Sequence, residues 1–265
     1  MKEQIISYLS PNFPWKDHFH FFPELDSTND RLKLMARQGA PHGTVLIADH
    51  QTGGHGRRGR SFLSPGGVGI YMSMLLRPNC APTELMHLTC ATAVAMCDAV
   101  ETAVGFRPGI KWTNDLVFGK RKLGGILTEL GLNPQGRVDF VIIGVGINCC
   151  QQEQDFDPSI RSIAGSLSMI SGNPVDRAAV AAAMMESLHQ MDARLLPGKQ
   201  ALLSQYRKDC ITIGQDISLV RGEDIRHGHA LDIDEEGALV VLFSDGHTEA
   251  VSSGEVSVRG MYGYV

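Results

Sequence analysis

The sequence lacks any apolar run near the roughly 20 residues that a membrane-spanning helix needs. Its first residues, MKEQIISYLS, lack the basic start and the long apolar stretch of a secretion signal. Its six cysteines include no C-x-x-C pair, and a disulfide framework is not expected in a chain of this size without such a signal. These absences exclude a membrane protein and predict a cytoplasmic one.

Composition excludes further classes of protein. Hydrophobic residues make up 43% of the 265 and charged residues 20%, with 29 glycines and 12 prolines. These values are ordinary for a globular protein, and they exclude a disordered chain, a collagen and a coiled coil. A chain of this length predicts one large domain, or one large and one small domain.

Positive charge is in the minority overall but concentrated at two points. The net charge is −5, which argues against general nucleic-acid binding. Three arginines nevertheless fall within residues 55–60, and residues 107–122 carry five cations against one carboxylate. Cations gathered in this way on an acidic protein predict a site for a focused anionic ligand.

Periodicity and end signals predict the order of the elements. We expect helices near 28–38, 82–105, 176–195 and 199–208, and strands at 43–49, 68–77, 110–118, 123–130 and 139–148. The strands at 110–118 and 123–130 should form a hairpin. The almost wholly apolar strand at 139–148 should lie in the centre of a sheet. After Cys210 only short strands and turns are suggested, so the predicted domains are 1–208 and a small β-barrel at 209–265.

The strongest motif is QTGGHGRRGRSF at 51–62. Its glycines let backbone N–H groups approach an anion closely, and the interleaved arginines add forked donors that suit phosphate or carboxylate. No G-K-[ST] follows, so this is not a Walker A loop. A solvated basic loop or an RNA-binding segment would show the same local pattern, and that alternative stays open.

A second motif, KWTNDLVFGKRKLGGILTEL at 111–130, places Lys111 and Lys122 near either end of the predicted hairpin. Asn114 and Asp115 lie between them and offer the oxygen ligands that Mg²⁺ prefers. The glycine pair at 124–125 indicates that something approaches the backbone closely. An ordinary Asx turn would explain Asn114 and Asp115 equally well.

A third motif is Asp26-Ser27-Thr28-Asn29, at the start of the first predicted helix. Its hydroxyls and the free N–H groups at a helix start can bind a polar ligand. Plain helix capping explains the same residues when the motif is taken alone.

Together these segments resemble the biotin–protein ligases (biotin–[acetyl-CoA-carboxylase] ligases). That family shows S-T-N at a helix start, a GRGRRGR loop, K-W-P-N-D-L followed by R-K-L-x-G-I-L-x-E, and then G-x-G-I-N. The sequence has, in the same order, DSTND at 26–30, GHGRRGR at 54–60, KWTNDL at 111–116, RKLGGILTEL at 121–130 and GVGIN at 144–148. The resemblance covers nearly the whole chain.

The resemblance implies an ATP-dependent ligase. Family members activate the biotin carboxylate with MgATP, which gives biotinyl-5′-AMP and pyrophosphate. They then transfer biotin to one lysine of a biotin carboxyl carrier protein, or of the carrier domain of a biotin-dependent carboxylase. The implied substrates are ATP and biotin, with Mg²⁺. Arginines, a lysine and a metal ion suit this chemistry because they lower the cost of bringing a carboxylate up to a phosphate.

Carried over position by position, the resemblance assigns roles to residues of this sequence. The implied catalytic residues are Lys122, Arg57 and Arg58. The implied biotin-binding residues are Ser27, Thr28, Asn29, Gln51, His55, Gly56, Arg57, Lys122, Gly124, Gly125, Gly144 and Gly146. The implied ATP-binding residues are Arg57, Arg58, Arg60, Lys111, Asn114, Lys122 and Asn148. Asp115 is the implied ligand of Mg²⁺.

Three positions depart from the family pattern. His55 stands where the family has the first arginine of its loop, so retention of the adenylate depends on whether that position contributes charge or only its backbone N–H. Thr113 replaces the proline of K-W-P-N-D and should keep the turn. Phe62 replaces the tryptophan that often follows the loop, which is a conservative apolar change.

The implied fold is α+β. A class II synthetase-like mixed β-sheet carries helices on one face, and a small SH3-like β-barrel follows it. Only 25 residues precede Asp26, fewer than a helix-turn-helix module needs, so we expect the short form of the family without a DNA-binding domain. Neither DNA nor membrane binding is expected. Some family members pair edge to edge, which leaves a homodimer open.

Two other functions stay open. A lipoate–protein ligase would share the scaffold, although GRGRRGR together with K-W-x-N-D-L is not expected in it. A non-enzymatic RNA-binding protein would use the RRGR loop and the barrel, although the net charge of −5 argues against it. The sequence does not indicate which carrier protein is used, and it assigns no role to Cys149-Cys150.

Overall fold

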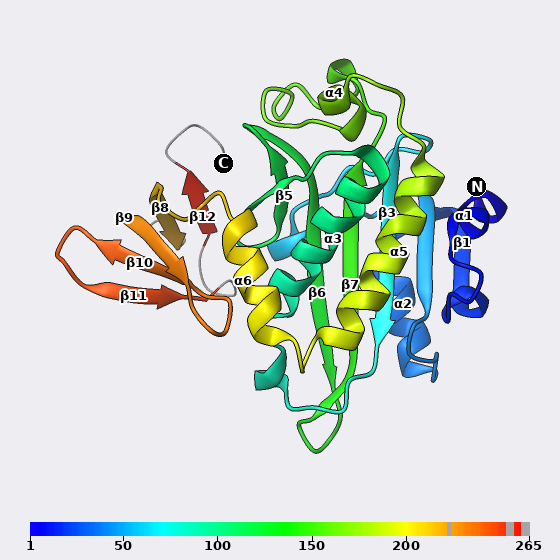
Figure 1. Cartoon of the computed structure of the whole chain (residues 1–265), viewed down its shortest axis with the longest axis horizontal. Helices are drawn as coiled ribbons and strands as arrows, with labels where there is room; N and C mark the ends of the chain where they lie inside the picture. Colours follow the sequence, from blue (N-terminus) through cyan, green and yellow to red (C-terminus); the bar gives the residue numbers. More distant parts are fainter. Residues whose placement is uncertain (222–223, 253–256, 261–265) are drawn as a thin grey trace.

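The computed structural model describes residues 1–221, 224–252 and 257–260. The larger of its two sheets has seven strands in the order β1-β2-β3-β7-β6-β5-β4 (Figure 1). Neighbouring strands are antiparallel except β1 and β2, which run parallel, so the sheet is mixed as predicted. Its strands are β1 (Phe19–Leu25), β2 (Val45–Gln51), β3 (Gly69–Leu76), β4 (Gly109–Lys111), β5 (Asp115–Phe118), β6 (Arg121–Leu132) and β7 (Val138–Asn148).

Helices and short 3₁₀ turns connect these strands. The described α-helices are α1 (Lys2–Tyr8), α2 (Thr28–Arg37), α3 (Leu88–Val104), α4 (Leu167–Ser171), α5 (Arg177–Arg194) and α6 (Lys199–Asp209). The described 3₁₀ turns are η1 (Lys16–His18), η2 (Arg57–Gly59), η3 (Pro82–Leu85) and η4 (Glu153–Asp155). Within the described ranges, no helix is both long enough and apolar enough to span a bilayer.

Helices α3 and α5 cover one face of the large sheet and enclose the main core (Figure 1). Helix α3 is buried over most of its circumference, as its almost wholly apolar sequence requires. From β7, Val141, Ile143 and Val145 belong to this core. Strand β7 is the middle strand of the seven, which confirms the central position predicted from its apolar sequence.

Helix α2 packs on the opposite face, where no helix was expected. Its Leu32 and Ala36 form a second core with Leu46, Leu75 and Ile142, which alternate along their strands with residues of the main core. The sheet therefore has helices on both faces, and the expectation of a single covered face is wrong. The physical reason is the two-residue period of a strand, because an apolar strand such as β7 needs cover on both sides.

The strand predicted at 110–118 is not continuous. Strand β4 turns back after Lys111 and pairs with β5, so that Lys111 lies opposite Asp115. The Trp112 N–H donates to Thr212 Oγ1 at 2.9 Å, and this bond holds the turn from a distant part of the chain. The predicted hairpin exists between β5 and β6. Propensity alone extends the strand through Trp112 because the contact that bends it is tertiary.

Some elements have weak sequence signals. Helices α1 and α4 are short, and β1 contains Pro23 and lies at the sheet edge, where a proline is tolerated. The helix predicted at 82–105 is interrupted, since η3 precedes an α3 that begins at Leu88. The other predicted helices and strands of the first domain are present, with ends that shift by a few residues.

The part of the chain after Cys210 holds strands and no helix among its described residues, as predicted. They are β8 (Asp216–Arg221), β9 (Asp224–Ile233), β10 (Leu239–Phe243), β11 (Thr248–Val251) and β12 (Ser257–Gly260), in the antiparallel order β11-β10-β9-β8-β12. This small sheet lies beyond α6, at one end of the molecule (Figure 1). The predicted domain boundary between 208 and 209 falls at the end of α6 and stays a prediction.

A buried hydrogen bond joins the large sheet to the turn between β9 and β10 of the small sheet. The Trp112 indole N–H donates to the Gly237 carbonyl at 3.0 Å, and Gly237 has a φ of +86°, which favours glycine.

His87 is fully buried, and its Nε2 donates to the Leu195 carbonyl at 2.7 Å. Its Nδ1 has no hydrogen-bond partner. Burial lowers the pKa of His87, because a second ring proton would have no acceptor there.

This arrangement predicts a pH dependence of stability. Below a pH near 6.5, the unfolded chain binds a proton at His87 and the folded chain does not, so stability should fall as the pH falls. The slope from this single group cannot exceed about 1.4 kcal/mol per pH unit. His87→Gln keeps a donor for the Leu195 carbonyl and should lose less stability between pH 7.5 and 5.5, as measured by urea unfolding. Equal losses in both proteins would contradict this account.

Candidate active site

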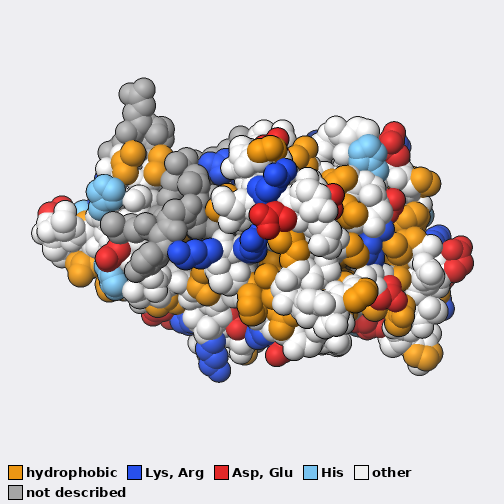
Figure 2. Space-filling view, turned by 90° about the horizontal axis from the view of Figure 1, so that it is seen from above, with side chains coloured by type: hydrophobic (Ala, Val, Ile, Leu, Met, Phe, Trp, Pro, Cys, Tyr) orange, Lys and Arg blue, Asp and Glu red, His pale blue; other side chains and the backbone are white. Residues whose placement is uncertain are grey.

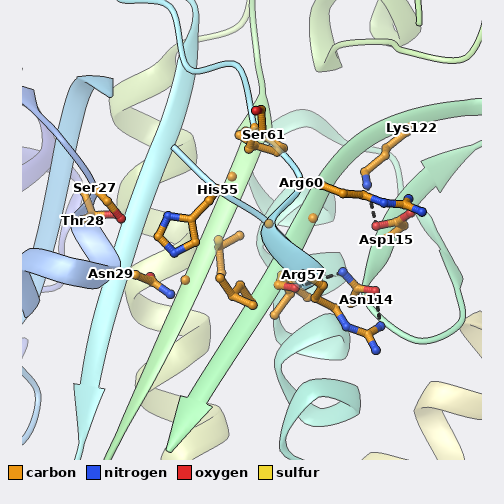
Figure 3. Close-up of a pocket in the computed structure, with 18 of the residues that line it drawn as sticks. Ser27, Thr28, Asn29, His55, Arg57, Arg60, Ser61, Asn114, Asp115 and Lys122 are labelled. Atoms are coloured by element: carbon orange, nitrogen blue, oxygen red, sulfur yellow. Dashed lines mark hydrogen bonds and ion pairs between the residues drawn. The ribbon is translucent and has the colours of Figure 1, made fainter. Parts of the chain in front are cut away.

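A cavity of about 210 Å³ lies on the α2 side of the large sheet (Figure 3). All three motifs of the sequence reach it, together with the glycines of β7. The predicted site residues that line it are Ser27, Thr28, Asn29, Gln51, His55, Gly56, Arg57, Arg60, Lys111, Asn114, Asp115, Lys122, Gly125, Gly144 and Gly146. Segments more than a hundred residues apart in the chain are thus brought to one place.

Three predicted residues stand apart from this group. Gly124 does not line the cavity, and a Cβ there would collide with the backbone of Gly146, so this glycine serves the close approach of β6 and β7. Asn148 also lies outside the lining. The side chain of Arg58 falls outside the described part of the structure.

The polar end of the cavity is built from the start of α2 and the end of β2. Ser27 caps the helix through its side chain. The Thr28 N–H and hydroxyl both donate to the Gln51 side-chain oxygen, at 2.8 and 3.0 Å. Asn29 is 5% exposed and donates through Nδ2 to Glu129 at 2.8 Å. Because these polar groups have defined partners, this end presents a fixed pattern of donors and acceptors.

Glycines form the floor of the cavity. A Cβ at Gly144 on β7 would collide with the Asn29 side chain, and one at Gly146 would lie 2.5 Å from the Phe62 ring. Gly125 on β6 lies opposite Gly146. The missing side chains let Asn29 and Phe62 close onto the strands and leave backbone as the floor between them.

The other end of the cavity carries the positive charge (Figure 3). Arg57, Arg60, Lys111 and Lys122 line it, and among the described lining residues Asp115 is the only carboxylate. Lys111 is only 7% exposed. A cavity with four cations against one carboxylate favours an anionic ligand, since burial strengthens each charge interaction.

Hydrogen bonds order the side chains at this cationic end. Lys122 Nζ lies 2.6 Å from Asp115 Oδ1, and Arg57 Nη1 donates to Asn114 Oδ1 at 2.9 Å. Asn114 in turn donates through Nδ2 to the Ile126 carbonyl at 3.0 Å. Side chains that face the cavity therefore link the β4–β5 turn to the glycine–arginine loop (residues 51–62).

Backbone contacts hold Lys122 in place. Its N–H donates to the Ile163 carbonyl at 2.6 Å, and its carbonyl accepts from the Gly165 N–H at 2.9 Å. Asn148 secures the same segment, since its Nδ2 donates to the Gly165 carbonyl at 3.0 Å. The structure thus places Asn148 behind Lys122 and not on the cavity wall, where its predicted contact with ATP would be made.

The three departures from the family pattern have local structural roles. His55 Nδ1 lies 3.7 Å from Asp30 Oδ2, so its imidazole faces the polar end of the cavity and α2. Thr113 is buried in the β4–β5 turn. Phe62 packs edge-on against Tyr71, with ring centroids 6.3 Å apart. The turn and the apolar contact expected at the last two positions are both present.

Two polar residues near the polar end were not predicted. Ser73 is fully buried in β3 and bonds to both Thr28 and Asn29. Glu129 on β6 accepts from Asn29. Each has a signal in the sequence: Ser73 is the one serine in the apolar strand GIYMSMLL, and Glu129 closes the motif RKLGGILTE.

The described residues offer little to a metal ion held by protein alone. No group of three or more His, Cys, Asp or Glu side chains among them could hold one. Mg²⁺ in nucleotide sites is commonly held by one or two carboxylates together with the substrate phosphates and water. Asp115 meets that smaller requirement, in competition with its ion pair to Lys122.

Known proteins match this chain over both of its sheets. Residues 21–148 match the Biotin/lipoate A/B protein ligase family, and residues 212–259 match the Biotin protein ligase C terminal domain. The bifunctional ligase/repressor BirA of Bacillus spizizenii is 35% identical over 230 residues, which is 86% of this chain and 70% of that protein. The biotin–[acetyl-CoA-carboxylase] ligase of Mycobacterium tuberculosis is 35% identical over 240 residues, 87% of this chain and 85% of that protein.

The fold agrees with the same class. A biotin protein ligase from Aquifex aeolicus, solved in complex with biotin and ATP, has a TM-score of 0.78 at 30% identity and covers 91% of this chain and 98% of its own. The matched models and this fold define the class, the biotin and lipoate protein ligases. Within it, the chain belongs to the biotin protein ligase family. The family and the fold indicated by the sequence motifs are thereby confirmed.

The glycine floor yields a test of the site geometry. Gly144→Ala should destabilise the protein by about 1–3 kcal/mol, because the new methyl group displaces an Asn29 side chain that is held by two hydrogen bonds. Urea unfolding measures the change. Gly125→Ala is the matched control, since its methyl would lie at an ordinary 3.6 Å from Asp115 and Lys122. If both variants unfold alike, Gly144 has no steric role.

Proposed function

We propose that this chain is an ATP-dependent biotin–protein ligase that forms biotinyl-5′-AMP and transfers biotin to a lysine of a biotin carboxyl carrier protein. One observation carries the proposal. A single cavity joins a polar, glycine-floored end to a cationic end formed by Arg57, Arg60, Lys111 and Lys122. A flat, polar ring with an acidic tail fits the first end, and a triphosphate fits the second.

The first reaction joins two anions. A biotin carboxylate oxygen attacks the α-phosphorus of ATP, and pyrophosphate leaves. We assign Lys122 to this step, and its position supports the assignment, since a Cβ built at Gly125 on the floor would lie 3.6 Å from Lys122 Nζ. Its ammonium group can therefore approach both the tail of a ligand on the floor and a phosphate at the cationic end. Arg57, held by Asn114, adds a fixed guanidinium, so catalysis rests on positioning and charge.

The second reaction transfers the biotinyl group from the adenylate to a lysine of the carrier. The amine of a carrier lysine attacks the carbonyl carbon of the adenylate, the nitrogen loses a proton, and AMP leaves. The relative from Mycobacterium tuberculosis is named for acetyl-CoA carboxylase, which supports a carrier protein or domain of a biotin-dependent carboxylase as the partner. The same cations that bind ATP stabilise AMP as it departs.

We assign Mg²⁺ to the nucleotide rather than to a protein cage. When bound, it neutralises phosphate charge, and Asp115 is the side chain that would hold it from the protein side. Asn114 is oriented by its bonds to Arg57 and to the Ile126 carbonyl, so it belongs to the phosphate end as a hydrogen-bonding group.

Biotin is favoured over lipoate and over RNA. The relatives from Bacillus spizizenii and Mycobacterium tuberculosis are named as biotin ligases or BirA, whereas lipoate is named in the broader family that the chain matches. Over the coloured part of the face in Figure 2, lysines and arginines are interspersed with acidic and apolar side chains, and do not form the basic stripe that RNA binding favours.

We further propose that the protein acts in the cytoplasm, where its six free thiols would persist. Activity without DNA binding, and a homodimer formed through a sheet edge, both stay predictions. Native mass spectrometry of the full chain would show whether the homodimer forms. A DNA-binding titration at low salt would test for DNA binding.

Calorimetry separates the two ligase activities. We expect biotin to bind with micromolar or tighter affinity, and binding to tighten with a non-hydrolysable ATP analogue, while lipoate gives no heat. The physical reason is that the polar end has fixed donors and acceptors that suit a cyclic urea, and lipoate has none to match them. Heat with lipoate and none with biotin would reverse the assignment. If neither biotin nor lipoate gives binding heat, the ligase proposal is overturned.

Lys122→Ala should slow adenylate formation by about a hundredfold, which corresponds to about 3 kcal/mol of transition-state stabilisation, because it removes a preorganised cation from the reacting oxygens. Biotin-dependent exchange of pyrophosphate into ATP measures the rate. Lys120→Ala is the control, since Lys120 is an exposed lysine two residues away. A loss of less than fivefold at Lys122 would remove it from this role.

A further inference from the structure

A chain of hydrogen bonds runs beneath the polar end of the cavity. Glu129 on β6 lies at one end of it, between Lys33 and Asn29 on α2 (2.9 Å from Oε1 to Lys33 Nζ and 2.8 Å from Oε2 to Asn29 Nδ2). Asn29 Oδ1 accepts from Ser73 Oγ at 2.5 Å, and Ser73 Oγ lies 2.7 Å from Thr28 Oγ1.

The same chain continues to the glycine–arginine loop. Thr28 donates to Gln51, and Gln51 Nε2 donates to Ser64 Oγ at 3.0 Å. Ser64 Oγ then donates to the Phe62 carbonyl at 2.9 Å. The network thus connects Glu129, which lies behind the cavity-lining Asn29, to the loop of residues 51–62 that also lines the cavity.

Glu129 determines which way the Asn29 amide faces. The nitrogen and oxygen of an amide have the same shape, so only their neighbours choose between the two orientations. An ionised carboxylate accepts hydrogen bonds and cannot donate one. The Asn29 amino group must therefore face Glu129, and its oxygen must face Ser73.

This orientation propagates to the next hydroxyls. Ser73 has a single hydroxyl proton, and Asn29 Oδ1 can only accept, so that proton goes to Asn29. The same Ser73 hydroxyl also donates to Thr28 Oγ1, so Thr28 is an acceptor toward Ser73 and its own proton goes to Gln51. The hydroxyl of Thr28, a wall of the cavity, thus has its donor direction set by a carboxylate two side chains away.

Lys33 holds the Glu129 carboxylate in place from the other side. Its ammonium bonds to Glu129 and lies 2.7 Å from Asp30 Oδ1. Although burial lowers the pKa of Lys33, its bonds to the two carboxylates outweigh that effect and raise the pKa. The Lys33 ammonium, which can only donate, occupies Glu129 Oε1 and leaves Oε2 to accept from Asn29.

We propose that Glu129 is a positioning residue for recognition of the polar ring of the substrate, acting through Asn29, Ser73 and Thr28. This inference rests on the proposed function, because it concerns the end of the cavity assigned to the biotin ring. Glu129 itself need not touch the substrate. Its effect is to allow one pattern of donors and acceptors at the cavity wall and to exclude the pattern with the amide reversed.

Glu129→Gln tests the proposal with almost no change of shape. A glutamine can donate as well as accept, so both orientations of Asn29 become possible. The Kd and KM for biotin should rise about tenfold, with an unchanged KM for ATP, because a fixed hydrogen-bond pattern is lost at one end of the cavity only. Glu236→Gln is the matched control, since it removes another lysine–glutamate ion pair (2.8 Å to Lys199) on the surface.

A second ligand distinguishes a positioning role of Glu129 from a general weakening of biotin binding. In 2-thiobiotin, sulfur replaces the ring carbonyl oxygen, so the ring keeps its shape and charge but accepts hydrogen bonds poorly. The wild-type protein should prefer biotin, and Glu129→Gln should narrow the ratio of the two Kd values at least about fivefold. Ser73→Ala interrupts the same network and should narrow the ratio too, which keeps the test valid if Glu129→Gln does not fold.

The outcomes are distinct. If the wild-type protein binds biotin and neither variant changes the ratio or the biotin KM, the positioning role of Glu129 is overturned and the proposed function stands. If the wild-type protein binds neither compound, the proposed function fails, and the inference that rests on it fails too. An equal rise in the KM values for biotin and ATP would also overturn the positioning role, because it would indicate a general structural defect.

Discussion

The rest of the structure depends on the two different sides of β7. On one side, Val141, Ile143 and Val145 meet the apolar helices and form the main core. On the other side, Ile142 meets α2, and the strand then continues with Gly144 and Gly146. The Asn29 side chain of α2 can close onto the sheet because Gly144 has no side chain, and Phe62 closes onto it at Gly146. The same lack of side chains leaves room for the cavity, so core packing and site formation are one problem.

The cationic end imposes a second requirement, because like charges held together repel one another. The structure meets it with fixed partners: Lys122 pairs with Asp115, and Arg57 binds Asn114. The β4–β5 turn, which contains Asn114 and leads into Asp115, is itself held by bonds from outside the large sheet, at Thr212 and Gly237. The small C-terminal sheet is therefore part of the support of the active site, even though the described cavity contains none of its residues.

Much of the site could be predicted from the sequence, because its motifs are local. The residues 26–29, 54–60 and 111–122 each combine a turn or helix start with the polar groups that face the cavity, and such features are written in consecutive residues. Asn148 shows what local motifs leave open, since it lies outside the cavity lining and its contact with ATP stays a prediction. It ends a motif, yet its side chain turns to the Gly165 carbonyl because the segment after η4 packs there. Ser73 was missed for a related reason, since a single serine in an apolar strand gains its meaning only from the helix above it.

The sequence by itself determined the family, the alternation of helices and strands, and the gathering of cations in an acidic chain. These follow from periodicity and from short motifs, which need no knowledge of distant contacts. The tertiary structure alone decided which face α2 covers, where the 110–118 segment turns, and which acceptor orients Asn29. Each of these depends on groups far apart in the chain, such as Glu129 and Asn29, which are separated by 100 residues but 2.8 Å apart in space. Local propensity carries no information about such a pairing, because the free energy that favours it exists only once the sheet has formed.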